Sequence, residues 1–213
     1  IAMLSQQMGS LLRSSVDVES VNAEKAFFDQ VGVAAAVART TRNSDTPLMD
    51  TPHTRRMVTM TDYEYADLID SQDKIRMLAD PTSTYARAAA AAMGRAMDDV
   101  IIAAMHGTAK TGASGATSVS FPAAQQIAHG SAGLTIAKLL SAKEILDANS
   151  VDPSIPRYLV ASPKQMSDLL GTTQVTSSDF NTVKSLVQGQ IDSFMGFKFI
   201  SSNRLPHNGT SRQ

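Results

Sequence analysis

Residues 80–107 read DPTSTYARAAAAAMGRAMDDVIIAAMHG, and this stretch decides the fold. Asp80 is suited to cap the first free amides, and Pro81 suits the first helical position, where its missing N–H has no partner to lose. Gly107 is expected to adopt the left-handed conformation that ends a helix. The roughly 26 residues between these signals span about 39 Å, more than twice the usual helix length. A helix this long, with small side chains and little chemistry, indicates a strut rather than the wall of an active site.

The faces of this helix are predicted from its periodicity. Arg95 and Asp99 stand four residues apart on the wetter side and are expected to pair. Gly94 costs about 1 kcal/mol relative to alanine in a helix, so its presence predicts a tight contact or a bend. The expected apolar stripe, which follows spacings of four, four, four and three residues, consists of Ala89, Met93, Met97, Ile101 and Ala104.

Upstream of the helix the sequence predicts an arm followed by a long β-hairpin. Residues 1–22 show no sustained period and predict an extended arm with a turn of helix. Aromatic residues and valines favour a strand over 26–39, with a bulge or bend at Gly32. Side chains alternate over 55–69 with the period of two of a second strand, and 43–53 carries the turn chemistry between them. Such a hairpin would be about 40 Å long at 3.3 Å per residue.

This hairpin needs support from elsewhere. Neither of its faces is apolar enough to be buried in a monomer, and an isolated two-stranded hairpin is marginal in water. Two arrangements would supply the support: a neighbouring copy of the same chain lying against the hairpin, or the hairpin folding back over its own domain. The first is the more economical.

Downstream of the helix the pattern becomes α/β. Residues 110–133 are rich in Gly, Ser and Ala and predict a loop with one short strand near 118–121. Ser162, Pro163 and Gln165 supply the N-cap, first-turn proline and capping box of another helix. That helix is expected to end at Gly171. The remaining expected elements are helices over 134–149 and 180–188 and strands over 157–161 and 197–201. The residues expected to face inward from the helix over 134–149 are Ile136, Leu139, Leu140 and Ile145.

The composition excludes several classes of protein. Cysteine is absent, which excludes disulfides, thiolate catalysis and cysteine-based zinc sites. The sequence has no run of 18 apolar residues and therefore no expected membrane span. Its net charge of −1 divides into −4 up to Gly107 and +3 after it. No basic stripe marks a nucleic-acid site, although copies arranged head to tail would bring segments of opposite charge together.

No motif in the sequence carries catalytic chemistry. The run 107–112 lacks the Gly-Lys-Ser/Thr of a phosphate loop, because Ala109 precedes its lysine, and it leaves a helix rather than opening one. Asp98 and Asp99 point some 100° apart on a helix, so we interpret them as a solvated face rather than an acid–base pair. Catalytic, cofactor-binding and metal-ligating residues are therefore expected to be absent. The four histidines share no metal-ligand spacing, and they are His53, His106, His129 and His207.

Several long blocks of the sequence resemble one family of tailed-bacteriophage major capsid proteins. In order, they read TPHTRRMVTMTDYEYADLID, QDKIRML, AMGRAMDDVIIAA and TSSDFNTVKSLVQGQIDSFMGFKFISSNRLP. The resemblance extends from about Met3 to Leu205, and the succession of hairpin, long helix and α/β part agrees with it. It implies an α+β capsid fold in four parts: an N-terminal arm (1–25), a long β-hairpin extended loop (26–75), a peripheral domain with the spine helix (76–110), and an α/β axial domain (111–213) whose C-terminal part is missing.

Two departures from the family matter. Its members continue for several dozen residues past the Asn203–Pro206 motif, with further axial strands and a return strand to the peripheral domain. The chain also begins with Ile1 rather than Met, so we expect both of its ends to be trimmed. Some phage capsids also join their subunits covalently through a lysine in the extended loop. Between Ala26 and Asp73 this chain has no lysine, so cross-linking through this loop is not expected.

The resemblance implies a structural, non-enzymatic protein that assembles with itself into hexamers and pentamers of an icosahedral phage head around double-stranded DNA. Its expected location is the virion, after assembly in the host cytoplasm. Its expected partners are portal, scaffolding and decoration proteins and the packaged DNA, with no membrane and no cofactor. Two alternatives are an encapsulin-like shell around a protein cargo and a small α/β enzyme with its site in 111–213. The residues expected to form ion pairs between subunits are placed at the tip of the extended loop, and they are Asp45, Asp50, Arg55 and Arg56.

Overall fold

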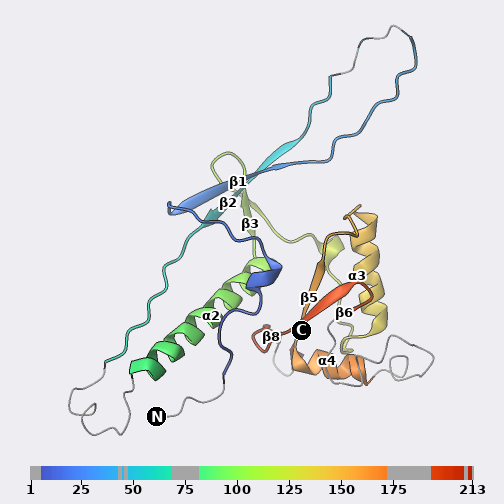
Figure 1. Cartoon of the computed structure of the whole chain (residues 1–213). Helices are drawn as coiled ribbons and strands as arrows, with labels where there is room; N and C mark the ends of the chain where they lie inside the picture. Colours follow the sequence, from blue (N-terminus) through green and yellow to red (C-terminus); the bar gives the residue numbers. More distant parts are fainter. Residues whose placement is uncertain are drawn as a thin grey trace, which may run out of the picture. The chain divides into compact units, whose positions relative to one another are not determined.

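The computed structural model describes residues 6–42, 45, 48–68, 82–171, 193–208 and 211–212. The chain divides into two compact units (Figure 1). The hairpin unit contains Glu19–Glu64 and His106–Phe121, and the helical unit contains Ile1–Val18, Tyr65–Met105 and Pro122–Gln213. Each unit therefore joins segments that are far apart in the sequence.

The hairpin unit is built on an antiparallel pair of strands. β1 (Lys25–Val31) and β2 (His53–Thr59) pair from Lys25↔Thr59 to Val31↔His53, which confirms the predicted hairpin. The strands are shorter than the expected 26–39 and 55–69. Regular pairing ends where the Gly32 amide donates to the Pro52 carbonyl at 2.7 Å, and Pro52 itself has no amide to continue the ladder.

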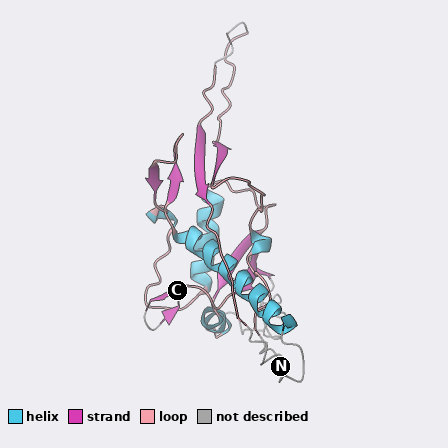
Figure 2. Cartoon of the chain, turned by 90° about the vertical axis from the view of Figure 1, so that its left-hand side faces the viewer, coloured by secondary structure: helices cyan, strands magenta, loops and turns pink. Residues whose placement is uncertain are grey.

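The connection between β1 and β2 is correspondingly longer than the expected 43–53. Its described residues, 33–42, 45 and 48–52, contain no strand, and nearly all of their side chains are exposed. Figure 2 shows this loop continuing from both strands of the hairpin. The run of alanines at 34–36 explains part of the difference, because alanine offers little of the cross-strand side-chain contact that stabilises a two-stranded ribbon.

Two further strands complete the sheet in the order β1-β2-β3-β4. β3 (Ala109–Thr111) pairs antiparallel with β2 and with β4 (Thr117–Val119), so the predicted single strand near 118–121 is replaced by a small hairpin. Its turn contains Gly115 at φ +71°, and a Cβ there would lie 2.5 Å from the Met57 Sδ. Glycine is required at this position both for its backbone conformation and for its size.

The long helix is confirmed as α2 (Thr82–His106), 25 residues or about 38 Å in length. The predicted capping residues Asp80 and Pro81 lie outside the described residues. Gly107 follows the last helical residue as expected, but it is not among the glycines with positive φ, so the helix does not end in the left-handed conformation that we predicted.

The predicted apolar stripe of α2 is not its covered face. Met97 is 47% exposed and Ala104 is also exposed, whereas Ala91 and Asp98 are completely buried. The covered positions 91, 94, 98 and 102 follow helical spacing, and their centre lies about 125° around the helix from the centre of the stripe. Periodicity shows that a helix has an apolar side, but it does not show which side the rest of the chain covers.

The N-terminal arm covers this small-residue face of α2. Residues 6–22 contain a 3-10 turn, η1 (Arg13–Ser15), as predicted, and no longer helix and no strand. Gly94 is a point of tight contact: a Cβ there would lie 2.4 Å from the carbonyl carbon of Gly9. The predicted pair between Arg95 and Asp99 is wrong, because Arg95 donates to Gln6 and Asp99 accepts from a more distant arginine.

The α/β part of the helical unit has a parallel pair of strands at its centre. β5 (Arg157–Ala161) and β7 (Phe197–Ser201) pair in parallel, and β6 (Ser193–Phe194) adds to β7 antiparallel. The bounds of β5 and β7 match the predicted strands. The remaining elements are η2 (Ala123–Gln125) and the pair β8 (His207–Asn208) and β9 (Ser211–Arg212); the latter pair was not predicted, nor was β6.

Two helices accompany this sheet. α3 (Ile136–Ala148) is capped by Thr135, and α4 (Pro163–Leu170) begins with the predicted capping box of Ser162 and Gln165 and ends before Gly171. Leu139 and Leu169 form the buried centre of the core. Leu140, expected to face inward, is 51% exposed. The helix predicted over 180–188 lies outside the described residues, and in the described part of the chain no helix is long and apolar enough to span a membrane.

Candidate assembly interface on the hairpin sheet

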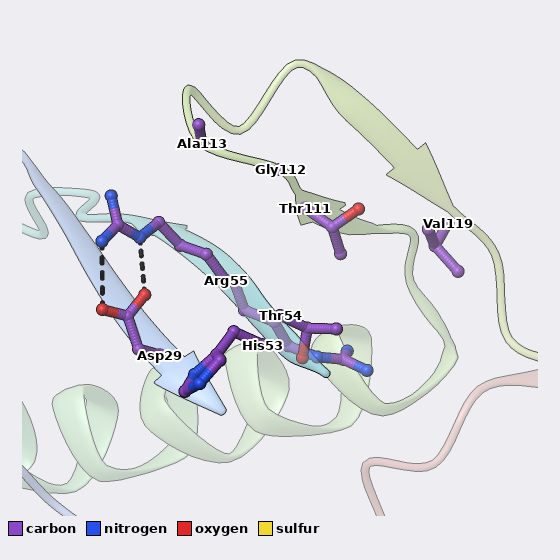
Figure 3. Close-up of a pocket in the computed structure, with 9 residues that line it drawn as sticks. Asp29, His53, Thr54, Arg55, Thr111, Gly112, Ala113 and Val119 are labelled. Carbon is purple, nitrogen blue, oxygen red and sulfur yellow. Dashed lines mark hydrogen bonds and ion pairs between the residues drawn. The ribbon is translucent and has the colours of Figure 1, made fainter. Parts of the chain in front are cut away.

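The β1–β2 register brings a carboxylate and a guanidinium together on one face of the sheet. Asp29 and Arg55 are direct cross-strand partners, so their side chains lie side by side. Arg55 donates from Nε and Nη2 to the two Asp29 oxygens at 2.5 and 3.0 Å (Figure 3). The hydrogen bond lowers the pKa of Asp29 and raises the pKa of Arg55. Sequence reasoning missed Asp29, although the correct hairpin register would have identified it.

The same face carries apolar surface next to this ion pair. The Arg55 guanidinium lies 5.9 Å from the centroid of the Phe27 ring, and Phe27 is paired with Met57 across the strands. Phe27 remains 44% exposed. This face therefore presents an arginine clamped by its carboxylate beside an open aromatic ring, a combination that is enriched where proteins meet.

The other face of the sheet carries a second arginine with fewer bonds. Arg56 donates from Nε to the Gln30 side-chain oxygen at 3.1 Å and lies opposite Thr111 of β3. The Arg56 side chain is exposed. Unlike Arg55, Arg56 has no carboxylate partner among the described residues. Its guanidinium can therefore pair with a carboxylate of another chain.

A solvent-open hollow of about 820 Å³ lies along β2 and β3 (Figure 3). Among the described residues, its cationic side chains are Arg55 and Arg56, its acidic side chain is Asp29, and His53 also lines it. Its remaining lining comes from Thr54, Thr111, Gly112, Ala113 and Val119. Hydroxyls and cations on an open wall favour carboxylates or backbone carbonyls of another protein.

The four residues expected to form ion pairs between subunits lie in two different places. Asp45 and Asp50 lie in the connection between β1 and β2 and are exposed. Arg55 and Arg56 lie in β2 and not at the tip of the loop. Their placement as a single group of tip residues is therefore wrong. The structure brings together Arg55 and Arg56 as neighbours on opposite faces, and it joins Arg55 to Asp29 rather than to Asp45 or Asp50.

The hairpin unit leaves many apolar side chains uncovered by its own chain. Val33 is 94% and Leu48 is fully exposed, and both lie in the connection between the two strands. The other exposed apolar side chains of this unit are Phe27, Val31, Val37, Met49, Val58, Met60, Tyr63, Val119 and Phe121. Apolar exposure that continues along both faces of one structural unit is typical of a surface that another protein covers.

The geometry of the described residues is that of a binding surface. No group of three or more His, Asp or Glu side chains among them lies close enough together to hold a metal ion. The hollow on the hairpin sheet is open and has no nucleophile held by a base. The fold and this surface define a structural protein of the kind that packs against other protein chains.

A protein-family model described as phage capsid protein matches residues 1–213, so the chain belongs to the phage capsid protein family. This confirms the resemblance inferred from the sequence blocks. The chain is a structural protein of the phage capsid, part of the virion, and not an enzyme. No curated protein matches the chain.

Solved structures agree with this assignment at the level of the fold. A chain in the capsid structure of the cyanophage P-SCSP1u has a TM-score of 0.71 and 18% sequence identity, over 99% of this chain and 68% of that one. A chain in the structure of Mycobacterium phage Che8 has a TM-score of 0.55 and 16% identity, over 88% of this chain and 65% of that one. The present chain thus spans about two thirds of the length of these chains, and the predicted α+β capsid fold is confirmed.

Proposed function

We propose that this chain is the major capsid protein of a tailed phage, and that it forms the hexamers and pentamers of an icosahedral head around double-stranded DNA. The observation that carries this proposal is the hairpin unit, whose apolar side chains are exposed on both faces of the sheet and along its connecting loop. Membership of the phage capsid family supports the same conclusion.

The four-part division gives each segment a place in such a shell. Residues 1–25 form the N-terminal arm, 26–75 the extended loop, 76–110 the spine helix with its surroundings, and 111–213 most of the axial domain. In this arrangement the extended loop of one subunit lies across its neighbour and the axial domains meet at the centre of each capsomer. Burial of exposed side chains such as Val33 and Leu48 would then drive association.

Ion pairs between subunits add specificity to this contact. Arg56 is the best placed of the basic residues, because it is exposed and donates to the neutral side-chain amide of Gln30. Its proposed partners are Asp45 or Asp50 of the neighbouring subunit's loop. Arg55 takes part less directly, since Asp29 already holds it. The extended loop has no lysine from Ala26 to Asp73, so the shell depends on non-covalent contacts here.

Electron microscopy of the expressed full-length protein tests the proposal. The expected result is closed shells of uniform diameter, or rings of six and five subunits. A protein that stays monomeric at high concentration, both with and without a scaffolding protein, would contradict it.

Charge reversal tests the role of the hairpin sheet in assembly. Arg56→Glu should lower the yield of particles, and Asp50→Arg in the same chain should restore part of it if these residues meet across the interface. Arg13→Glu is the matched control, because Arg13 is exposed but belongs to the helical unit. An equal loss of particles from both single variants would show that the effect is not specific to the sheet.

The cargo of purified particles distinguishes the phage head from an encapsulin-like compartment. Nuclease-resistant double-stranded DNA, together with portal protein at one vertex, is expected for a head. A protein cargo and no DNA would identify a compartment shell instead.

A further inference from the structure

In the described part of the chain, the hydrogen bonds to the Asp98 carboxylate come from the N-terminal arm. Asp98 is completely buried, and it accepts hydrogen bonds from the Gln7 side chain at 2.6 Å and the Ser10 hydroxyl at 2.5 Å. The backbone amides of Leu11 and Leu12 also donate to it, both at 3.2 Å. Consecutive amides that point at one anion form a compact cradle for its charge. The interpretation of Asp98 as part of a solvated face is therefore wrong.

The shape of α2 fixes where the arm lies. Gly94, one turn before Asp98, touches the backbone of Gly9, and the small Ala91 is also fully buried on this side of the helix. Leu12 is completely buried at the end of the arm segment. The close contact at Gly9 and the bonds to Asp98 together allow residues 6–12 only one register along the helix.

The contact is nevertheless of a kind that can open. Among the described residues, the four donors to Asp98 are neutral and come from the arm. When the arm leaves, water can reach the carboxylate and replace these bonds, so no unpaired charge is left buried in an apolar core. Opening the arm therefore does not require α2 to unfold.

The next residue fastens a different part of the chain. The Asp99 carboxylate accepts hydrogen bonds from both Nε and Nη2 of Arg204, a residue that follows β7. This segment is joined to the sheet in turn, because the Arg204 amide donates to the Ser202 hydroxyl at 3.2 Å and the Ser202 amide donates to the Ala161 carbonyl at 2.9 Å. Through Asp98, one side of α2 thus binds the arm. Through Asp99, the neighbouring side of the helix binds the segment at the end of the β5–β7 sheet.

We propose that Asp98 and Asp99 are two independent latches on α2. Asp98 holds the N-terminal arm and Asp99 holds the segment around Arg204, and either segment is released without the other and without loss of the helix. This device belongs to the folded subunit and does not depend on the proposed architecture of the shell.

Hydrogen exchange with mass spectrometry tests the two latches separately. Asp98→Asn should speed exchange of the Leu11 and Leu12 amides by about 10- to 100-fold, the range expected when a hydrogen bond to a charged group is lost. Asp99→Asn is the matched control on the neighbouring residue. It should speed exchange of the Arg204 amide by about two- to fivefold, as for a partly exposed ion pair, and leave the arm unchanged. Trypsin cleavage after Arg13, which lies in η1, gives a second measure of arm release.

Two results would overturn the proposal. One is exchange of the arm in Asp98→Asn that equals that of the parent protein. The other is a similar increase at the arm, at Arg204 and along α2 in both variants, which would mean general loosening rather than separate latches. If Asp98→Asn fails to fold, Ser10→Ala removes the 2.5 Å bond to Asp98 together with the local bond from the Arg13 amide to the Ser10 hydroxyl. It should still speed exchange in the arm severalfold while α2 stays protected.

Discussion

Gly94→Ala should strengthen α2 and weaken the docking of the arm at the same time. Alanine in place of glycine favours a helix by about 0.8–1.0 kcal/mol. The new Cβ, however, would lie 2.4, 2.5 and 2.9 Å from the carbonyl carbon, Cα and oxygen of Gly9, where ordinary contacts are 3.4–4 Å. Because these are backbone atoms, no side-chain rotation relieves the overlap, and the arm must retreat by about 1 Å.

The cost of this retreat follows from the hydrogen bonds to Asp98. The Leu11 and Leu12 amides are already 3.2 Å from the carboxylate, so a further 1 Å breaks both bonds. At about 1.5 kcal/mol each, the lower value for bonds to a charged group, the loss is about 3 kcal/mol. Because α2 stays helical whether the arm is docked or open, the gain in helix propensity does not offset this loss. The arm is therefore less firmly docked by about 3 kcal/mol, which is about a 160-fold rise in its open population.

Hydrogen exchange on separate peptides measures these opposite effects. Peptides from the arm should exchange about 160-fold faster in Gly94→Ala, while peptides from α2 should exchange at the parent rate or more slowly. Gly171→Ala is the control, because its φ is −73° and its Cβ would lie 3.4 Å from the nearest atom. Unchanged exchange of the arm in Gly94→Ala, or faster exchange of α2, would refute the reasoning.

Three further predictions concern stability. Burial would raise the pKa of Asp98, but the hydrogen bonds from the arm outweigh it and lower this pKa below the ordinary value of 3.8. The difference in unfolding free energy between the parent and Asp98→Asn should therefore be constant well above pH 3.8 and shrink as the pH falls through the lowered pKa. Urea titrations between about pH 2 and 7 measure this difference. Ser162→Ala removes the capping box of α4 and should cost about 1 kcal/mol in urea unfolding, whereas Ser167→Ala, in the exposed helix interior, should change it by less than about 0.5 kcal/mol. Leu139→Ala should cost about 2–5 kcal/mol because Leu139 is 1% exposed, while the same change at half-exposed Leu140 should cost less than about 1 kcal/mol, and equal losses would contradict the assigned core.

Local signals in the sequence predicted local structure well. The capping box at Ser162 and the short apolar runs of β5 and β7 were identified because a few adjacent residues determine each of them. The contacts of Asp98 and Asp29 were not identified, because their partners are distant in the sequence. The partners of Asp98 lie 86 to 91 residues away along the chain, and the partner of Asp29 lies 26 residues away. The covered face of α2 was misplaced for the same reason: the helix has small residues on one side and larger apolar residues on the other, and only the position of the arm determines which side is buried.

The strand pairing in the hairpin unit determines when each strand can find its partner during synthesis of the chain. β2 pairs with β3 through Arg56↔Thr111 and Met57↔Lys110, so its second neighbour is made only after the whole of α2 has been translated. At about 5–20 residues per second, a ribosome needs roughly 3–10 seconds to pass from β2 to β3. During that interval the nascent chain carries β2 with one edge unpaired, and exposed strand edges promote association with other chains. The newly made subunit is therefore most vulnerable to aggregation while its long helix is emerging.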